Sequence, residues 1–217
     1  MKIIFWAELV GTAFLVMIVL GSGTMAQNLY PGQIGAALLA NSIATGAGLF
    51  ALIQTLGTIS GAHINPLVSL VELLWKRINT KQFCVYVSAQ MIGAYLGVLS
   101  THLMFNLPLF VISSIERSGT HLIYSEFVAT FGFIMVIALC GKKHVEFAPL
   151  SVALYITAGY WFTSSTAFTN PAVTFARMFT NTFGGMSPVH FLPLAFAQIF
   201  GSLFAWFLLS RLLPSEK

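Results

Sequence analysis

Apolar residues run in long stretches along this chain instead of alternating with polar ones. A helix needs about 20 mostly apolar residues to cross roughly 30 Å of hydrocarbon. Six stretches meet or approach that length, and each predicts a membrane-spanning helix. The predicted spans are Ile3–Met25, Ile34–Leu56, Phe83–Phe105, Leu122–Cys140, Ala148–Ser164 and Phe191–Leu213.

Two further segments, Ile59–Trp75 and Ser165–Thr180, are too short and too polar at their starts to span. Each has a small polar stretch, then Asn-Pro, then an apolar run of helical length. Irregular backbone at membrane depth is tolerated only where protein buries it or where it lines a wet cavity. Each segment is therefore predicted to be a re-entrant loop followed by a half-helix, with two amphipathic surface helices as the alternative.

The composition supports a membrane protein and excludes most soluble classes. The 217 residues are 57% hydrophobic and only 7% charged, whereas soluble domains carry roughly 25% charged residues. A soluble enzyme or a nucleic-acid-binding protein is thus not expected. The sequence shows no nucleophile–base set, no phosphate loop and no metal-ligand spacing around Cys84 or Cys140. We therefore expect no catalysis, no cofactor and no metal.

The basic residues orient the predicted spans. An even number of spans places both termini on one side of the membrane. Most basic residues fall on that side, and only Arg117 lies clearly in a loop on the other. The positive-inside rule then predicts cytoplasmic termini in a multi-pass inner-membrane protein. The residues on the side of the termini are Lys2, Lys76, Arg77, Lys81, Lys142, Lys143, Arg211 and Lys217.

The chain reads as two copies of one unit within a single domain, residues 1–217. The copies cover residues 1–106 and 120–213 approximately, and each holds three spans and one half-helix. Because three is odd, the second copy inserts upside down relative to the first, and such inverted repeats place a site near the midplane. The matching pairs are Glu8 with Glu126, Asn65-Pro66 with Asn170-Pro171, and Gln90 with Gln198.

The Asn-Pro pairs predict two helix starts that meet at mid-membrane. Proline suits the first turn of a helix, and asparagine is a strong N-cap. A cation at the midplane meets two positive helix ends. A neutral hydroxylated solute meets the free amide donors of Asn65 and Asn170.

These motifs identify the chain as similar to the aquaporin and aquaglyceroporin superfamily over essentially its whole length. The resemblance rests on Ser-Gly-Ala-His-Ile-Asn-Pro at 60–66, on Asn170-Pro171-Ala172, and on the repeated Glu and Gln residues. It implies an all-α fold of six transmembrane helices and two re-entrant half-helices. It further implies a passive channel for small neutral solutes in the lipid bilayer, with one pore per protomer of a homotetramer.

The chain departs from the family pattern at two motif positions. Leu67 follows the first Asn-Pro where alanine is usual. Val173 occupies the position, three residues after Asn170, that usually carries the arginine of the outer constriction. By spacing, the resemblance assigns the lining of that constriction to Thr45, Ala158, Ala167 and Val173, with Ile156 competing with Ala158 for the position in the fifth span.

These small residues predict that the outer constriction, which we call the neck, is wide and rather apolar. Such a neck favours glycerol and other polyols, urea and metalloid hydroxides such as arsenite, and water also enters the expectation. A strictly water-selective pore is the alternative.

Arg177 lies one helical turn beyond Val173, and helical side chains tilt toward the N-terminus. It could therefore supply a relocated charge to the outer vestibule, with Glu116 as its acidic neighbour. The alternative is a structural arginine that binds carbonyl groups near the end of the half-helix.

The ionisable residues within spans are assigned support roles by the resemblance. Glu8 and Glu126 are expected to hold the loop backbones, with Gln90 and Gln198 beside them. A proton relay through the two glutamates would instead indicate a secondary transporter. His63 is expected to be structural, with a pH gate as the alternative.

Two further local patterns make structural predictions. Glu72 with Lys76 four residues later predicts a helix-surface ion pair, with an inner-vestibule role for Glu72 as the alternative. Gly93-x-x-x-Gly97 and Gly57-x-x-x-Gly61 predict close helix approach.

Overall fold

The computed structural model describes residues 1–212, and the side chains of all of these except Lys142 and Lys143. Helices and loops account for this whole range, which contains no strand, so the predicted all-α class is confirmed. Leu213 and Lys217, named in the predicted last span and in the charge pattern, lie outside the described residues. The α-helices are α1 (Lys2–Leu29), α2 (Ile34–Ser60), α3 (Pro66–Leu74), α4 (Thr80–Met104), α5 (Thr120–Lys143), α6 (Ala148–Phe162), α7 (Pro171–Ala176) and α8 (Phe191–Leu212). Short 3₁₀ turns are η1 (Val145–Phe147), η2 (Arg177–Phe179) and η3 (Pro188–His190).

Five helical segments are long and apolar enough to cross a membrane: Lys2–Leu29, Ile34–Ser60, Thr80–Met104, Thr120–Gly141 and Pro188–Leu212. The remaining predicted span forms α6, which has only 15 residues and follows η1. At 1.5 Å per residue, α6 measures about 22 Å, less than the hydrocarbon thickness of roughly 30 Å.

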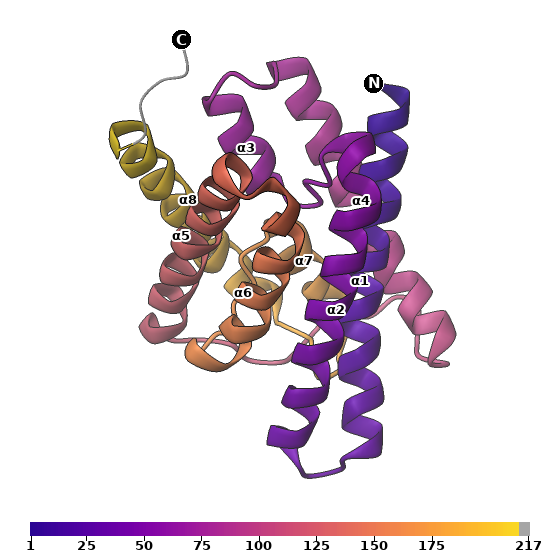
Figure 1. The fold of residues 1–217 in the computed structure, drawn as a ribbon. Helices are drawn as coiled ribbons and strands as arrows, with labels where there is room; N and C mark the ends of the chain where they lie inside the picture. The colour runs from indigo at the N-terminus through magenta and orange to yellow at the C-terminus, as the bar shows by residue number, and fades with distance from the viewer. Residues whose placement is uncertain (213–217) are drawn as a thin grey trace.

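The half-helices α3 and α7 lie in the interior of the bundle, among the long helices (Figure 1). Each begins at the proline of an Asn-Pro pair, with the asparagine as its N-cap. The two half-helices contact each other. This arrangement matches the predicted pair of re-entrant segments.

The long helices pack as two related sets, as an inverted repeat requires. In the first set α1 packs against α4 and α2, and in the second α5 packs against α8 and α6. The sets join where α2 meets α6, and each half-helix contacts a long helix of the other set: α3 meets α8, and α7 meets α4. The site between the half-helices is thus enclosed by both repeats.

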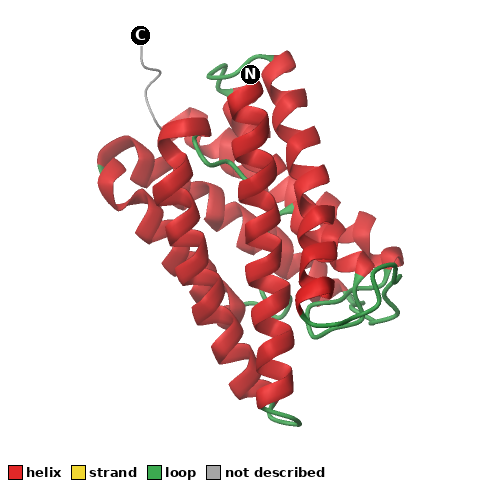
Figure 2. Cartoon of the chain, turned by 90° about the vertical axis from the view of Figure 1, so that its right-hand side faces the viewer, coloured by secondary structure: helices red, strands yellow, loops and turns green. Residues whose placement is uncertain are grey.

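The N-terminus and the end of α8 lie at the same end of the bundle, while the turn between α1 and α2 lies at the other (Figure 1). Long loops gather in one group beside the helices (Figure 2). Residues 106–119 pair there with the segment after α7, through Ser113 N–H to the Met178 carbonyl at 2.8 Å and Ser187 N–H to the Ile115 carbonyl at 2.8 Å.

Glycines at helix crossings support only part of the predicted close approach. A Cβ on Gly93 would overlap the carbonyl group of Leu9 in α1, and one on Gly97 would come within 2.6 Å of the Ala13 carbonyl oxygen. The second predicted pair is wrong as a packing motif. A Cβ on Gly57 would meet nothing within 4 Å, and Gly61 ends α2 with φ of +82°.

Candidate pore and its neck

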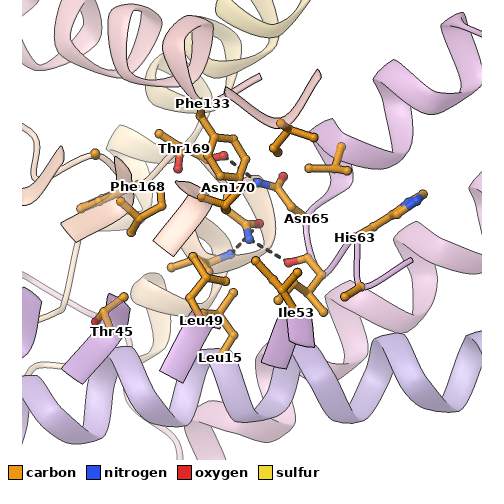
Figure 3. Close-up of a pocket in the computed structure, with 18 of the residues that line it drawn as sticks. Leu15, Thr45, Leu49, Ile53, His63, Asn65, Phe133, Phe168, Thr169 and Asn170 are labelled. Carbon is orange, nitrogen blue, oxygen red and sulfur yellow. Dashed lines mark hydrogen bonds between the residues drawn. The ribbon is translucent and has the colours of Figure 1, made fainter. Parts of the chain in front are cut away.

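The side chains of Asn65 and Asn170 tie the two re-entrant loops together at the centre of the molecule. Each Oδ1 caps its own half-helix, accepting from Leu67 N–H at 2.9 Å and from Ala172 N–H at 3.0 Å. Each Nδ2 donates across to the other loop, Asn65 to the Thr169 carbonyl at 2.8 Å and Asn170 to the Ile64 carbonyl at 2.9 Å (Figure 3).

One hydrogen of each amide is therefore engaged between the loops. The expectation that both donors of each asparagine are free is corrected to one donor per side chain. Both asparagines border a central cavity, so the remaining donors have a solute-sized space beside them.

A buried carboxylate holds each loop. Glu8 in α1 accepts from the Ser60 hydroxyl at 2.6 Å, from His63 N–H at 3.0 Å and from Ile64 N–H at 2.7 Å. Gln90 Nε2 donates to Glu8 at 2.8 Å and to the Ser69 hydroxyl at 3.2 Å. Glu8 and Gln90 are both fully buried.

The second re-entrant loop is supported in nearly the same way, with three donors to the carboxylate in place of four. Glu126 in α5 accepts from Phe168 N–H at 2.8 Å and from Thr169 N–H at 2.9 Å. Gln198 Nε2 donates to Glu126 at 2.7 Å and to the Thr174 hydroxyl at 2.9 Å. Ser69 and Thr174 each lie four residues after their asparagine, so the two supports are related by the repeat.

This support turns backbone carbonyl groups toward the cavity. In a trans peptide the N–H and the preceding C=O point in opposite directions. Since Glu8 and Glu126 bind the N–H groups of four loop residues, the carbonyl groups of Ala62, His63, Ala167 and Phe168 point away from the carboxylates, and all four residues border the cavity.

The two re-entrant loops adopt strained backbone conformations when their carbonyl groups point toward the cavity. Ala62 and Ile64 have φ of 47° and 39°, and Ala167 and Thr169 have φ of 49° and 47°. Left-handed conformations are costly for residues other than glycine and persist only where surrounding contacts hold them. The carboxylates of Glu8 and Glu126 provide those contacts.

The central cavity has a volume of about 200 Å³. Loop backbone and the two asparagines form one wall, and apolar side chains of the surrounding helices form the other, with Leu15, Leu49 and Ile53 facing the asparagines in Figure 3. The remaining apolar lining from the helices comprises Val19, Val68, Phe133, Ile137, Ala148, Val152, Ile156 and Val173.

The other motif residues lie behind this wall. Pro66, Leu67, Pro171 and Ala172 are absent from the cavity lining. Leu67 is buried with 2% of its surface exposed. The departure from alanine at this position therefore changes packing around the half-helix and not the cavity surface itself.

Three of the four residues predicted for the outer neck border the cavity, and one does not. Thr45, Ala167 and Val173 line it, whereas Ala158 lies on the exposed side of α6. The assignment of Ala158 is therefore wrong. Ile156 and Tyr160, four residues apart and hence on one helix face, line the cavity from α6. Counting along the span missed Tyr160, although it follows Ile156 by one turn.

Polar side chains border the cavity beside these small residues, so this part of its wall is less apolar than predicted. The hydroxyl oxygens of Thr45 and Tyr160 are 3.1 Å apart. Arg177 borders the same cavity and is 4% exposed. Its Nη1 donates to the Gly184 carbonyl at 2.7 Å, and its guanidinium lies 3.9 Å from the centre of the Phe168 ring. Both alternatives drawn for Arg177 thus apply, because it binds a carbonyl and also borders the neck.

Two expected ion pairs have different partners in the structure. Glu116 pairs with His190 at 2.7 Å and not with Arg177. Glu72 pairs with Arg77 at 3.0 Å and not with Lys76. Chain order could not reveal either partner, since both depend on how turns and loops fold back.

His63 is held in place by neighbours on two sides. Its Nδ1 lies 2.9 Å from the Ser69 hydroxyl, and its ring stacks on Tyr86 with centroids 4.2 Å apart. The imidazole points away from the two asparagines in Figure 3. Between residues 1 and 212, no group of three His, Cys, Asp or Glu side chains has the arrangement of a metal site.

Residues 2–164 match the family described as major intrinsic protein. The chain is 46% identical over 211 residues to Aquaglyceroporin AqpS of Rhizobium meliloti (strain 1021), covering 97% of this chain and 90% of that protein. It is 31% identical to Aquaporin Z of Rhodopseudomonas palustris, covering 68% and 67% of the two chains. The crystal structure of the aquaglyceroporin from Plasmodium falciparum has the same fold, with a TM-score of 0.71 at 24% identity over 97% of this chain and 96% of that one. With two re-entrant loops joined by Asn65 and Asn170 inside a bundle of apolar helices, this integral membrane protein belongs to the major intrinsic protein family.

Proposed function

We propose that the protein is a passive channel for small uncharged hydroxylated solutes, with glycerol and other polyols as the principal class. This proposal rests on the central cavity, which has one polar wall and one apolar wall. A polyol loses hydrogen bonds to water when it enters a narrow pore, and that loss is costly unless the pore replaces them. Backbone carbonyl groups and the amides of Asn65 and Asn170 offer acceptors and donors on one wall, while the carbon chain meets apolar side chains on the other.

Exclusion of cations follows from charge. The N-terminal ends of the half-helices carry partial positive charge, and Arg177 adds a full one at the neck. A passing cation meets both, whereas a neutral solute meets only hydrogen-bonding groups. Pore diameter, lining donors and electrostatic barriers together set selectivity in channels of this type.

The solute list extends beyond glycerol to urea, to neutral metalloid hydroxides such as arsenite, and to water. The relative from Rhizobium meliloti, which is named an aquaglyceroporin, supports this class. A strictly water-selective pore is the second candidate. The 3.1 Å separation between the Thr45 and Tyr160 hydroxyls favours it, because that contact narrows the neck.

A secondary transporter that moves protons through Glu8 and Glu126 is the less favoured reading. Both carboxylates are fully buried and accept hydrogen bonds from loop N–H groups and a glutamine. Glu8 accepts from four donors and Glu126 from three. Such hydrogen bonds stabilise the ionised form of a carboxylate, which then does not carry a proton. The protein accordingly has no coupling ion and no catalytic step in this proposal.

The assembly and the placement in the membrane belong to the same proposal. Each protomer is one domain of two inverted repeats, approximately 1–106 and 120–213, and four protomers assemble with one pore each. The termini face the cytoplasm of a bacterial inner membrane. The common position of the N-terminus and the end of α8 agrees with both termini lying on one side of the membrane (Figure 1).

Stopped-flow light scattering on proteoliposomes tests the function. Vesicles facing an inward glycerol gradient should shrink and then re-swell quickly, while vesicles in sucrose should shrink only. Arsenite uptake on the same vesicles tests the wider class. Rapid shrinkage without glycerol entry would instead establish the water-selective candidate, and saturable uptake dependent on an ion gradient would establish a transporter.

A further inference from the structure

A second cavity of about 190 Å³ lies beside the neck and shares Tyr160 and Arg177 with the central one. We call it the vestibule. Arg117, from the loop before α5, and Thr166, from the loop before α7, also border it. The vestibule therefore brings two arginines from different loops to one entrance of the neck.

The two guanidinium groups share one aromatic ring. Arg177 lies 3.9 Å and Arg117 5.4 Å from the centre of the Phe168 ring. Backbone carbonyl groups of residues 183–185 position both guanidinium groups. Arg177 donates to the Gly184 carbonyl. Arg117 donates through Nε to the Gly185 carbonyl at 2.9 Å and through Nη2 to the Phe183 carbonyl at 3.1 Å.

These hydrogen bonds leave donors available on both groups. A guanidinium has five N–H donors, and those just described use one on Arg177 and two on Arg117. Nε of Arg177 is fully buried and has no hydrogen-bond partner within residues 1–212. Both arginine side chains border the vestibule, so their other free N–H groups are the donors available to a ligand there.

No carboxylate within the described part of the chain forms an ion pair with either arginine. Glu116, the acid closest in sequence to Arg117, pairs with His190. Glu126 attracts both arginines over a longer range, but its oxygens already accept from two loop N–H groups and Gln198. Burial, together with the neighbouring Arg177 charge, lowers the pKa of Arg117 to about 10. Arg117 is thus still charged at neutral pH, and the vestibule carries two positive charges.

We propose that the vestibule is a binding site for a small tetrahedral oxyanion, held between Arg117 and Arg177 with Thr166 as a further donor. The forked donors of arginine match the oxygens of such an anion. Past the neck, much of the cavity wall is apolar, and an anion that entered would lose hydration without replacement there. The ligand is therefore held at the entrance and does not pass.

Calorimetric titration of the full-length protein with inorganic phosphate at constant ionic strength tests this site. The protein is held in maltoside detergent micelles, which contain no phosphate. We expect saturable binding that weakens by about tenfold or more in Arg177→Gln and in Arg117→Gln, since each variant removes a charge-assisted hydrogen bond to the anion. Arg77 pairs with Glu72 and does not border the vestibule. Arg77→Gln should therefore bind phosphate like the unmodified protein.

Because Arg117 also supports the loop at 183–185, its replacement could disturb folding. Thr166→Val leaves that support intact and should weaken phosphate binding by a smaller factor, with an unchanged melting temperature. Absence of saturable binding in the unmodified protein would overturn the proposal, as would equal binding by folded Arg117→Gln and Arg177→Gln.

A lipid phosphate could supply the same chemistry as free phosphate. Nanodiscs containing phosphatidylglycerol separate the two sources. Competition by the lipid would lower the apparent affinity for inorganic phosphate there and assign the site to a headgroup, whereas unchanged affinity would assign it to the free anion. Binding is measured without flux, so its outcome is independent of whether the protein conducts glycerol.

Discussion

The hydroxyl oxygens of Thr45 in α2 and Tyr160 in α6 lie 3.1 Å apart and join the two inverted repeats at the neck of the cavity. The contact lies where α2 packs against α6, which is where the two sets of long helices meet. Tyr160 also borders the vestibule. Tyr160 and Arg177 are thus the residues that the vestibule shares with the central cavity.

Removing the Tyr160 side chain should widen the neck. We expect Tyr160→Ala to raise the flux of erythritol relative to glycerol by about tenfold, which corresponds to about 1.4 kcal/mol removed from the entry barrier. Stopped-flow re-swelling with each polyol measures the ratio. Ala158→Ser, on the exposed side of α6, is the matched control and should leave the ratio unchanged. If Ala158→Ser changed the ratio and Tyr160→Ala did not, the assignment of this helix face would be wrong.

A second arginine in the neck should close it. Val173 is 5% exposed and borders the central cavity, one turn before Arg177. We expect Val173→Arg to lower glycerol flux by about tenfold or more, because a long cation in this space adds bulk and must also be desolvated. Val173→Leu separates bulk from charge and should lower flux less. Glycerol flux equal to that of the unmodified channel would show that residue 173 does not limit passage.

Loss of the Arg177 charge should weaken the barrier to cations. We expect Arg177→Ala to increase potassium conductance and glycerol permeability in proteoliposomes, since the positive charge at the neck is removed. Val173 remains in both proteins, so the difference reports on Arg177 alone. A folded Arg177→Ala variant with unchanged solute and cation permeability would contradict its position at the neck.

The buried carboxylates should be required for stability in both repeats. Glu8→Gln would turn an amide NH₂ toward loop N–H groups, leaving buried donors without acceptors at about 1–3 kcal/mol each. We expect a clear fall in the melting temperature in detergent, and a similar fall for Glu126→Gln because the two networks are related by the repeat. Glu116→Gln affects only an exposed pair with His190, worth about 0–1 kcal/mol, and serves as control. A melting temperature for Glu8→Gln as high as that of the control would argue against this role.

Close packing of α1 on α4 should depend on Gly93. A Cβ there would overlap the Leu9 carbonyl group, so Gly93→Ala should destabilise the protein by about 1–3 kcal/mol. Gly57 offers a matched comparison, since its added Cβ would meet nothing within 4 Å. Gly57→Ala should be neutral or stabilising by up to about 1 kcal/mol, because alanine favours the helix. Thermal unfolding of both variants in one detergent tests the contrast, which the opposite order of stabilities would overturn.

The sequence by itself determined the architecture and the centre of the site. Long apolar runs define the helices, and the paired Asn-Pro residues identify the two half-helix starts, because these residue types begin and cap helices. Local physical rules suffice for such features. The support roles of the paired Glu and Gln residues came from the family resemblance.

Only the tertiary structure decided the character of the neck. Ala158 and Tyr160 differ by two residues in α6, and the rotation of that helix against α2 places one outside and the other in the pathway. Likewise, the fold of the loop at 183–190 brings carbonyl acceptors to Arg117 and Arg177 and places His190 where it pairs with Glu116. Helix rotation and loop path are set by packing between segments far apart in the chain, so neither can be read from residue spacing alone.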